Sequence, residues 1–200
     1  MVKNNANLKI GLFFGSFNPI HTGHLVIANH MVEFTDVNQV WFVISPHNPF
    51  KEKGSLLADH HRLAMVTIAV ENDARFKASN IEFHLPQPSY TIDTLTYLKE
   101  KYPEKAFVVI AGADQLPSFH KWKNWETLLE HYEVYVYPRP GFENIPEVFV
   151  NHPSIKIVNA PIMEISSSFI RQTIKEGKRV DYLLPEKVYR YVQEMHFYEK

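Results

Sequence analysis

Two histidines near the start of the chain have the spacing of a shared site. His21 and His24 lie three residues apart at the start of a predicted helix, so both side chains should emerge on one face of its first turn. A helix start also presents unpaired backbone N–H groups and the positive end of the helix dipole. Because imidazole N–H groups add further donors, this pattern predicts a site for an anion such as phosphate.

The loop before this helix contains the residues that such a site needs. An apolar run over residues 10–14 predicts a buried strand, and the turn-forming string GSFNP ends it. Gly15 would let the backbone approach a ligand, and Gly23 keeps a side chain out of the space between the two histidines. The sequence therefore predicts a strand, a tight loop and a helix that begins at Thr22.

Two simpler interpretations of the histidines remain open at this point. Histidines at i and i+3 can belong to a metal site, although the chain has no cysteine and no third ligand has an obvious spacing. They can also be two unrelated surface residues, which is the default for a random pair. The surrounding string G-S-F-N-P-x-H-x-G-H favours the phosphate site.

A second candidate anion site lies near the end of the chain. Ser166, Ser167 and Ser168 stand at the start of a predicted helix, where hydroxyls and unpaired N–H groups occur together. Arg171 follows three residues after Ser168 on the same face, and its guanidinium suits phosphate oxygens. Serine is also a common helix cap, so this motif alone would indicate only a cap. Together with the histidine motif it indicates a second phosphate contact.

The elements that must position these motifs alternate along the chain. Buried strands are predicted at residues 10–14, 39–44, 106–111, 134–137 and 155–158, with a short one at 81–83. Helices are predicted from Thr22, after Asp59 as a candidate cap, at 91–101 and 125–131, from Phe169 with Gly177 at its end, and from Pro185 to about Met195. Residues 142–154 are expected to be irregular. This alternation predicts an α/β fold with a Rossmann-like parallel sheet, helices on both faces and ligands at the carboxyl ends of the strands.

Composition limits the classes of function. The 200 residues suit a single domain, with residues from about 166 to 200 as a small C-terminal helical appendage. A net charge of −1 argues against a nucleic-acid partner, since no basic excess exists to neutralise a phosphate backbone. The chain has no cysteine, no signal-peptide pattern and no apolar run long enough to span a membrane. We therefore expect a cytoplasmic protein with no membrane partner, and no feature indicates an oligomeric state.

Both motifs resemble those of a known superfamily. The H-x-G-H string and the string I-S-S-S-F-I-R, which begins at Ile165, are similar to the H-x-G-H and I-S-S-T-x-I-R signatures of the nucleotidyltransferases. In that superfamily the two motifs bind the triphosphate of a nucleotide from opposite sides. Class I aminoacyl-tRNA synthetases carry a related H-x-G-H, so the resemblance implies a superfamily rather than a substrate.

Over nearly its whole length the chain resembles the bacterial nicotinate-mononucleotide adenylyltransferases. The further shared motifs are Asn48-Pro49-Phe50-Lys51, Arg62 with Met65, Pro88-Ser89-Tyr90-Thr91, Gly112-Ala113-Asp114 followed by Trp122, and Asp181-Tyr182-Leu183-Leu184-Pro185. The last three are less widely shared than H-x-G-H and select this branch. Four positions depart from the usual pattern: Phe14 replaces Gly, Asn18 replaces Asp, Phe50 replaces the His before Lys51, and Ser168 replaces Thr.

The resemblance implies a reaction and a role for each motif. The phosphate of nicotinate mononucleotide would attack the α-phosphorus of ATP, giving deamido-NAD and pyrophosphate. The implied catalytic residues are His21, His24 and Arg171; the implied ATP and phosphate contacts are Gly15, Ser16, Phe17, Lys51, Ser166, Ser167, Ser168 and Arg171; the implied mononucleotide contacts are Tyr90, Thr91, Asp114 and Trp122. Mg²⁺ is expected on the ATP phosphates, with no dedicated protein ligands.

Two other functions compete with this interpretation. Another nucleotidyltransferase could use nicotinamide mononucleotide or phosphopantetheine, although Trp122 and the Ser-Tyr-Thr turn speak against phosphopantetheine. A catalytically silent nucleotide-binding regulator could use the same scaffold. The intact histidines and Arg171 favour an enzyme.

Overall fold

The sheet has the strand order of a nucleotide-binding fold. The structure, a computed structural model, describes residues 8–46 and 56–200. Within these residues, parallel strands form a six-stranded sheet in the order β3-β2-β1-β4-β5-β6. The strands are β1 (Lys9–Gly15), β2 (Gln39–Ile44), β3 (Phe76–Ser79), β4 (Ala106–Gly112), β5 (Glu133–Tyr137) and β6 (Ile155–Ile157). The predicted Rossmann-like sheet is confirmed, and its strand order reverses between β1 and β4.

The central strands β1, β2 and β4 are nearly continuous apolar runs because both faces of the sheet are covered. Along β1, Leu12 belongs to one buried cluster and Phe13 to the other. Along β4, Val109 belongs to the cluster that contains Leu12, and Ile110 belongs to the cluster that contains Phe13. Successive side chains of a strand point to opposite faces, so each central strand contributes to two hydrophobic cores.

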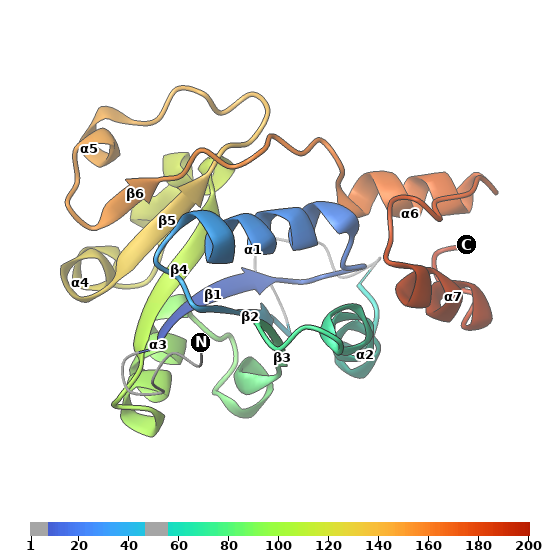
Figure 1. Cartoon of the computed structure of the whole chain (residues 1–200), viewed down its shortest axis with the longest axis horizontal. Helices are drawn as coiled ribbons and strands as arrows, with labels where there is room; N and C mark the ends of the chain where they lie inside the picture. Colours follow the sequence, from blue (N-terminus) through green and yellow to red (C-terminus); the bar gives the residue numbers. More distant parts are fainter. Residues whose placement is uncertain (1–7, 47–55) are drawn as a thin grey trace.

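Helices cover both faces of the sheet. The cluster that contains Phe13 also contains buried residues of α1 (Thr22–Phe34), α2 (Asp59–Val70), α6 (Ser167–Lys175) and α7 (Glu186–Glu194). The cluster that contains Leu12 includes residues of α3 (Thr91–Lys101), α4 (Trp125–His131) and α5 (Glu147–Val150). Figure 1 shows α6 and α7 on the side of the molecule toward which the β1 arrow points, so the C-terminal helices lie near the ligand edge of the sheet.

The predicted strand at residues 81–83 is wrong. Those residues belong to a short 3₁₀ helix, η2 (Ile81–His84), and the third strand is Phe76–Ser79 just before it. Phe76–Ser79 is an edge strand that pairs only with β2 among the described strands. Because much of an edge strand faces solvent, its residues lack the apolar run that reveals a central strand.

Smaller differences concern helix boundaries. Asp59 is the first residue of α2 rather than its cap, which is Ala58. The segment expected to be irregular contains the single turn α5, and the loop after β4 forms a 3₁₀ helix, η3 (Ala113–Lys121). Gly177 ends α6 as predicted, with a positive φ of 70° that favours glycine. None of the described helices is both long and apolar enough to cross a membrane.

Candidate active site

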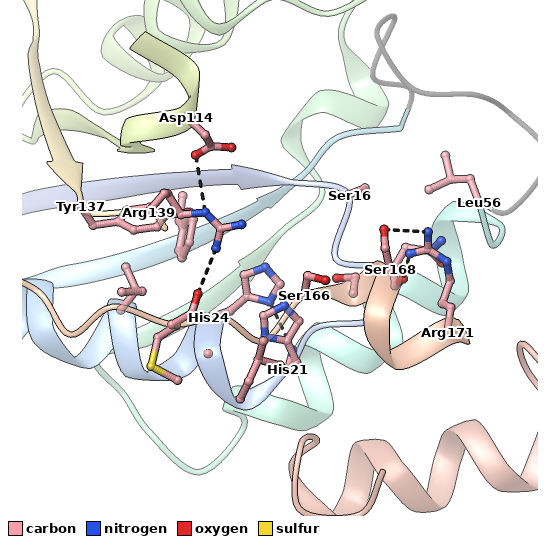
Figure 2. Close-up of a pocket in the computed structure, with 17 residues that line it drawn as sticks. Ser16, His21, His24, Leu56, Asp114, Tyr137, Arg139, Ser166, Ser168 and Arg171 are labelled. Carbon is pink, nitrogen blue, oxygen red and sulfur yellow. Dashed lines mark hydrogen bonds and ion pairs between the residues drawn. The ribbon is translucent and has the colours of Figure 1, made fainter. Parts of the chain in front are cut away.

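A cavity of about 570 Å³ opens at the carboxyl ends of the strands, where the strand order reverses. His21, His24, Ser166, Ser168 and Arg171 all line it, although about 150 residues separate the two motifs in sequence. Figure 2 shows the histidines at the start of α1 and the serines at the start of α6 beside the same space. The structure thus brings together the two motifs that the sequence singled out.

The two histidine rings are stacked. Their centroids are 3.7 Å apart, with an angle of 27° between the ring planes. The backbone N–H of His21 donates to Nδ1 of His24 at 3.2 Å. Because that nitrogen accepts a hydrogen bond, the ring proton of His24 lies on Nε2, where it can serve as a donor.

His21 is held in its neutral form. Its side chain is buried, and burial together with the charge of Arg139 lowers its pKa to about 4. Nδ1 of His21 has no hydrogen-bond partner among the described residues. Neutral imidazole keeps one N–H donor, so His21 can still bind phosphate oxygen near neutral pH.

The two glycines of the first motif have different roles. A Cβ atom on Gly23 would lie 3.0 Å from Nδ1 of His21, so glycine makes room for the stacked rings, as predicted. A Cβ atom on Gly15 would lie 2.9 Å from the ring of Phe17. Gly15 therefore makes room for a buried aromatic ring, and it does not line the cavity.

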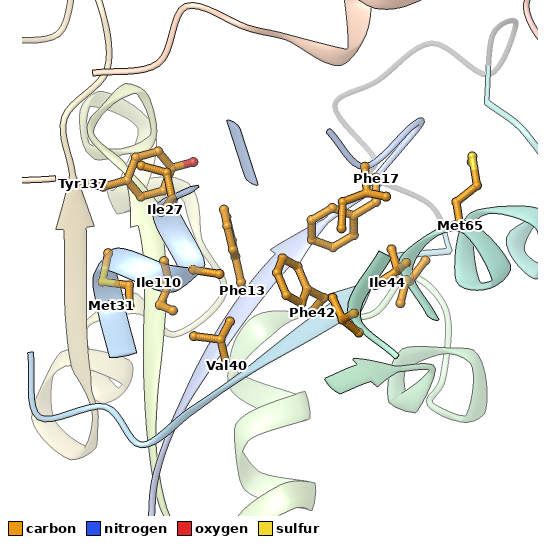
Figure 3. Packing of buried hydrophobic residues seen from close by; sticks show 14 of the residues in the cluster. Phe13, Phe17, Ile27, Met31, Val40, Phe42, Ile44, Met65, Ile110 and Tyr137 are labelled. Carbon is orange, nitrogen blue, oxygen red and sulfur yellow. The ribbon is translucent and has the colours of Figure 1, made fainter. Parts of the chain in front are cut away.

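Ser16 and Phe17, the other predicted phosphate-loop residues, are placed differently. Ser16 lines the cavity, whereas Phe17 is 2% exposed and does not. Figure 3 shows the Phe17 ring in the hydrophobic cluster with Phe13 and Phe42. The ring packs edge-on against both, at 5.9 and 5.5 Å between centroids. The Phe17 side chain therefore fixes the loop in the core while the backbone carries Ser16 to the cavity.

The serines at the start of α6 are joined to the first motif by hydrogen bonds. Ser166 is the helix cap, and its Oγ accepts from the backbone N–H of Phe169 at 3.2 Å. The hydroxyl of Ser167 donates to the carbonyl of Pro19 at 2.9 Å. These contacts hold the α6 start against the loop that precedes α1.

Arg171 links the same two segments. Its Nη1 donates to the carbonyl of Asn18 at 2.8 Å, and its Nη2 donates to Oγ of Ser168 at 3.2 Å. Ser168, which stands where the superfamily usually has Thr, therefore bonds the neighbouring arginine through its hydroxyl. The guanidinium lies at the edge of the cavity with its orientation fixed from two sides.

Arg62, one of the residues that the chain shares with the family it resembles, has a structural role in this fold. It is fully buried, and its Nη1 donates to the carbonyls of Ser16 and Ser45 at 2.7 and 2.8 Å. Asp59 in the same helix turn supplies the opposite charge at 2.5 Å. The unfavourable position of a cation in the first turn is thus offset by an acid and by the carbonyls of the loops after β1 and β2.

Arg139 is a cavity cation that the sequence did not assign. It follows β5, lines the cavity, and its Nε lies 3.6 Å from Oδ1 of Asp114 after β4. Its Nη1 donates weakly to the carbonyl of Met163 at 3.5 Å. The arginine in the string PRPG was visible at a predicted strand end, but only the fold shows that this end faces the histidines.

Most of the predicted mononucleotide residues lie outside the cavity wall. Among Tyr90, Thr91, Asp114 and Trp122, only Asp114 lines it. Tyr90 and Thr91 stand at the start of α3, and Trp122 stacks on Phe119 with 4.7 Å between centroids.

Lys123 connects the Trp122 segment to the α3 start. Its Nζ lies 4.9 Å from the centre of the Tyr90 ring and bonds Asp93 at 2.8 Å. Lys123 therefore connects the Trp122 segment and the start of α3 into one group of residues.

A family comparison agrees with this geometry. A family model described as Cytidylyltransferase-like matches residues 12–173, which include both motifs. The probable nicotinate-nucleotide adenylyltransferase of Christiangramia forsetii is 55% identical over 96% of this chain and 100% of its own length. The protein of the same name from Flavobacterium johnsoniae is 54% identical with the same coverage. This chain belongs to that family.

Solved structures show the same fold for the enzyme. A Plasmodium falciparum nicotinic acid mononucleotide adenylyltransferase complexed with NaAD has a TM-score of 0.81 over 96% of this chain and 98% of that chain, at 22% identity. A putative nicotinate-nucleotide adenylyltransferase from Vibrio parahaemolyticus has a TM-score of 0.72 at 19% identity, over 96% of both chains. At these identities the likeness concerns the fold.

The departures from the family pattern are accommodated within this fold. Phe14 packs against the cluster that contains Leu12. Asn18 is 3% exposed, and its Oδ1 accepts from the backbone N–H of Leu57 at 3.2 Å. Lys51 and Phe50, which the sequence assigned to a phosphate-binding loop, lie outside the described residues.

Proposed function

We propose that this cavity binds ATP and nicotinate mononucleotide and that the enzyme joins them, in the cytoplasm, to give deamido-NAD and pyrophosphate. The observation that carries the proposal is that two helix starts, those of α1 and α6, meet at one cavity with His21, His24 and Arg171 beside them. Two helix starts can bind several phosphate oxygens of one ligand at once. The names of the relatives at 54 and 55% identity support nicotinate mononucleotide as the acceptor.

The reaction needs no general base. A phosphate oxygen of the mononucleotide, already an anion near neutral pH, forms the new bond to the α-phosphorus of ATP. The bond from that phosphorus to the bridging oxygen breaks, and its electron pair leaves with pyrophosphate. The protein's contribution is therefore to position two anions and to provide donors where negative charge grows.

We assign the α- and β-phosphates to the histidine side of the cavity. Nε2 of His24 carries a proton and is oriented by the backbone of His21. His21 is neutral because its pKa is lowered, so its imidazole donates without carrying a charge. Arg171 and Lys51 are assigned to the β- and γ-phosphates, where a fixed cation stabilises the leaving pyrophosphate.

We assign the mononucleotide to the neighbouring group of residues. Trp122 offers an aromatic face for the pyridine ring, and the backbone N–H groups at Tyr90 and Thr91 offer donors for the nicotinate carboxylate. Asp114 lines the cavity, and we assign it to a ribose hydroxyl. Arg139, held by Asp114, adds positive charge where the acceptor phosphate must approach ATP.

Mg²⁺ belongs to the proposal as a companion of ATP. Among the described residues no group of three or more His, Asp or Glu side chains could hold a metal ion. The carboxylate of Asp114 in the cavity wall is already paired with Arg139. When bound, Mg²⁺ would neutralise phosphate charge while keeping waters and substrate oxygens as ligands.

A product assay tests the proposed function. The purified enzyme is incubated with ATP, Mg²⁺ and nicotinate mononucleotide, and the products are separated by chromatography and identified by mass. We expect deamido-NAD and pyrophosphate in equal amounts. Phosphopantetheine in place of the mononucleotide should give no product. A chain that binds ATP and forms no dinucleotide would instead be the silent regulator.

A further inference from the structure

The last six residues of the chain turn back toward the phosphate loop. After α7 the backbone reverses, with positive φ values of 53° at His196 and 68° at Tyr198. Such values are uncommon for bulky side chains, so the surroundings must hold them in place. The Phe197 ring packs edge-on against His61 of α2, at 4.8 Å between centroids, and against Tyr191 of α7 at 5.8 Å. The chain end is thereby packed against two helices.

This reversal brings the Tyr198 hydroxyl to the first motif. It donates to Oδ1 of Asn18 at 2.9 Å, across 180 residues of sequence. Burial raises the pKa of Tyr198, opposed by the charges of Arg171 and Arg62, so the hydroxyl stays protonated and remains a donor. Asn18 is buried, which makes each hydrogen bond to its side chain more valuable than one at the surface.

Asn18 is the meeting point of several segments. Its side-chain oxygen accepts from Tyr198 and from the backbone N–H of Leu57. Its main-chain carbonyl accepts from Arg171, which lines the cavity. The orientation of the Asn18 peptide therefore determines where the Arg171 guanidinium is held. Tyr198 itself is outside the cavity wall.

We propose that Tyr198 is a positioning residue for ATP binding: its hydroxyl fixes the Asn18 side chain, and Asn18 in turn fixes Arg171 beside the phosphates. The inference rests on the proposed function of the cavity and adds the chain end to the residues that support it. It predicts an effect on the nucleotide side of the reaction and little effect on the mononucleotide side.

Two phenylalanine variants test the proposal with a matched control. Tyr198→Phe removes the hydroxyl that bonds Asn18. Tyr191→Phe removes a hydroxyl from the same aromatic group, where it bonds Nδ1 of His61 at 2.9 Å instead. Kinetics of the full-length enzyme are measured with ATP and nicotinate mononucleotide varied in turn. Calorimetry with ATP alone gives a readout that does not depend on turnover.

The expected result separates the two hydroxyls. Tyr198→Phe should raise the KM and the Kd for ATP about tenfold, the size of one buried hydrogen bond, and change the mononucleotide KM by less than about twofold. Tyr191→Phe should change the KM and Kd for ATP and the KM for the mononucleotide by less than about twofold. Equal kinetics and equal ATP affinity for the two variants would overturn the proposal. A parent enzyme that binds ATP but makes no dinucleotide would instead reject the proposed function.

A double-mutant cycle checks that Tyr198 acts through Asn18. Asn18→Ala removes the acceptor, so adding Tyr198→Phe to it should change the ATP affinity no further. If the loss of ATP affinity in the double variant equalled the product of the two single losses, Tyr198 would act independently of Asn18, and the proposal would be overturned. If Asn18→Ala does not fold, the comparison of Tyr198→Phe with Tyr191→Phe still decides.

Discussion

The rings of His21 and His24 stack at 3.7 Å, and the backbone N–H of the first fixes the ring of the second. The pair combines two different environments. His21 is buried beside Arg139 and kept neutral, whereas His24 has its proton directed to Nε2 by a hydrogen bond on Nδ1. The result is a pair of oriented imidazoles whose geometry is set before a nucleotide arrives. In the proposed mechanism, which needs no base, preorganised donors of this kind are the main catalytic resource.

Replacing His24 should slow the chemical step. His24→Ala removes an oriented donor at the site of developing charge, so turnover should fall roughly 10²–10³-fold. His24→Gln keeps an N–H near the position of Nε2 and should retain more activity than His24→Asn. Steady-state kinetics of the three variants make the comparison, and equal activity of the Gln and Asn variants would argue against Nε2 as the donor.

The same account predicts direct transfer to the mononucleotide. ATP labelled at the α-phosphate, incubated with the enzyme and no acceptor, should leave no label on the protein after denaturation. A stable adenylyl-enzyme that forms in the parent and is missing in His24→Ala would establish a histidine nucleophile and contradict direct displacement.

The lowered pKa of His21 should make stability depend on pH. Between pH 4 and 6.5 the unfolded chain binds a proton at His21 that the folded chain does not, so the free energy of unfolding rises with pH through this window. The His21 contribution to the free energy of unfolding amounts to about 3 kcal/mol. It is fully present above pH 6.5 and is lost as the pH falls toward 4. Urea unfolding should show that the free energy of unfolding of the parent, relative to that of His21→Gln, rises as the pH is raised from 4 to 6.5.

Arg139 provides the control for that experiment. Its charge helps to lower the pKa of His21, so Arg139→Gln should raise that pKa and narrow the pH window. If the free energies of unfolding of the parent and of His21→Gln had the same dependence on pH from 4 to 7, His21 would not be buried as described.

Replacing Arg62 should destabilise the fold around both loops. Arg62→Met leaves the carbonyls of Ser16 and Ser45 without their donor in a buried region, so the free energy of unfolding should fall by about 3–5 kcal/mol. Asp59→Asn is the comparison variant: it keeps the carbonyl contacts of Arg62 and removes a counter-charge that is 43% exposed, so it should cost less than Arg62→Met. Chemical denaturation measures both, and similar losses would contradict the role assigned to the carbonyl contacts.

Trp122 should act on the mononucleotide without selecting between its two forms. Trp122→Ala should raise the KM of nicotinate and of nicotinamide mononucleotide by a similar factor, because ring stacking is common to both. Trp125→Ala is the control, since Trp125 also contacts the Phe119 ring, edge-on at 6.5 Å. We expect Trp125→Ala to lower the Tm with little change in the KM of either mononucleotide. If Trp125→Ala raised the KM as much as Trp122→Ala does, the effect of Trp122 would come from core packing and not from contact with the mononucleotide.

The central strands and most helices could be predicted because their signals are local. A buried parallel strand such as β4 is a continuous apolar run. The serines before α6 and Gly177 after it indicate where that helix begins and ends. The edge strand β3 gives no such run, and the sequence placed it a few residues too late. The other edge strand, β6, was predicted because it carries Ile155 and Ile157, whereas the residues of β3, Phe-Lys-Ala-Ser, form no apolar pattern.

The parts of the site that escaped prediction depend on contacts distant in sequence. Arg139 and Asp114 meet only because β4 and β5 are neighbours in the sheet. The ring of Phe17, which explains Gly15, packs against Phe13 and Phe42, which come from two strands that are neighbours only in the folded sheet. Tyr198 reaches Asn18 by a chain reversal that no motif marks. Motif spacing identifies the residues that face a ligand, whereas the supporting contacts require the fold.

The acids nearest the mononucleotide group bear on which acceptor is used. Nicotinate and nicotinamide have nearly the same shape, so only polar groups can separate them strongly. An acid able to accept from the carboxamide NH₂ would favour nicotinamide. Asp93 bonds Lys123, and buried Glu82 accepts from the Thr94 hydroxyl at 2.9 Å. The backbone N–H groups at the start of α3 are donors, which match a carboxylate.

The most direct test compares the two mononucleotides in the parent enzyme. With saturating ATP and Mg²⁺, kcat/KM is measured for nicotinate mononucleotide and for nicotinamide mononucleotide from the release of pyrophosphate. We predict a preference for the nicotinate form of at least about 10²-fold, the effect of one or two unpaired buried polar groups. Equal kcat/KM values for the two substrates would contradict the assignment to nicotinate.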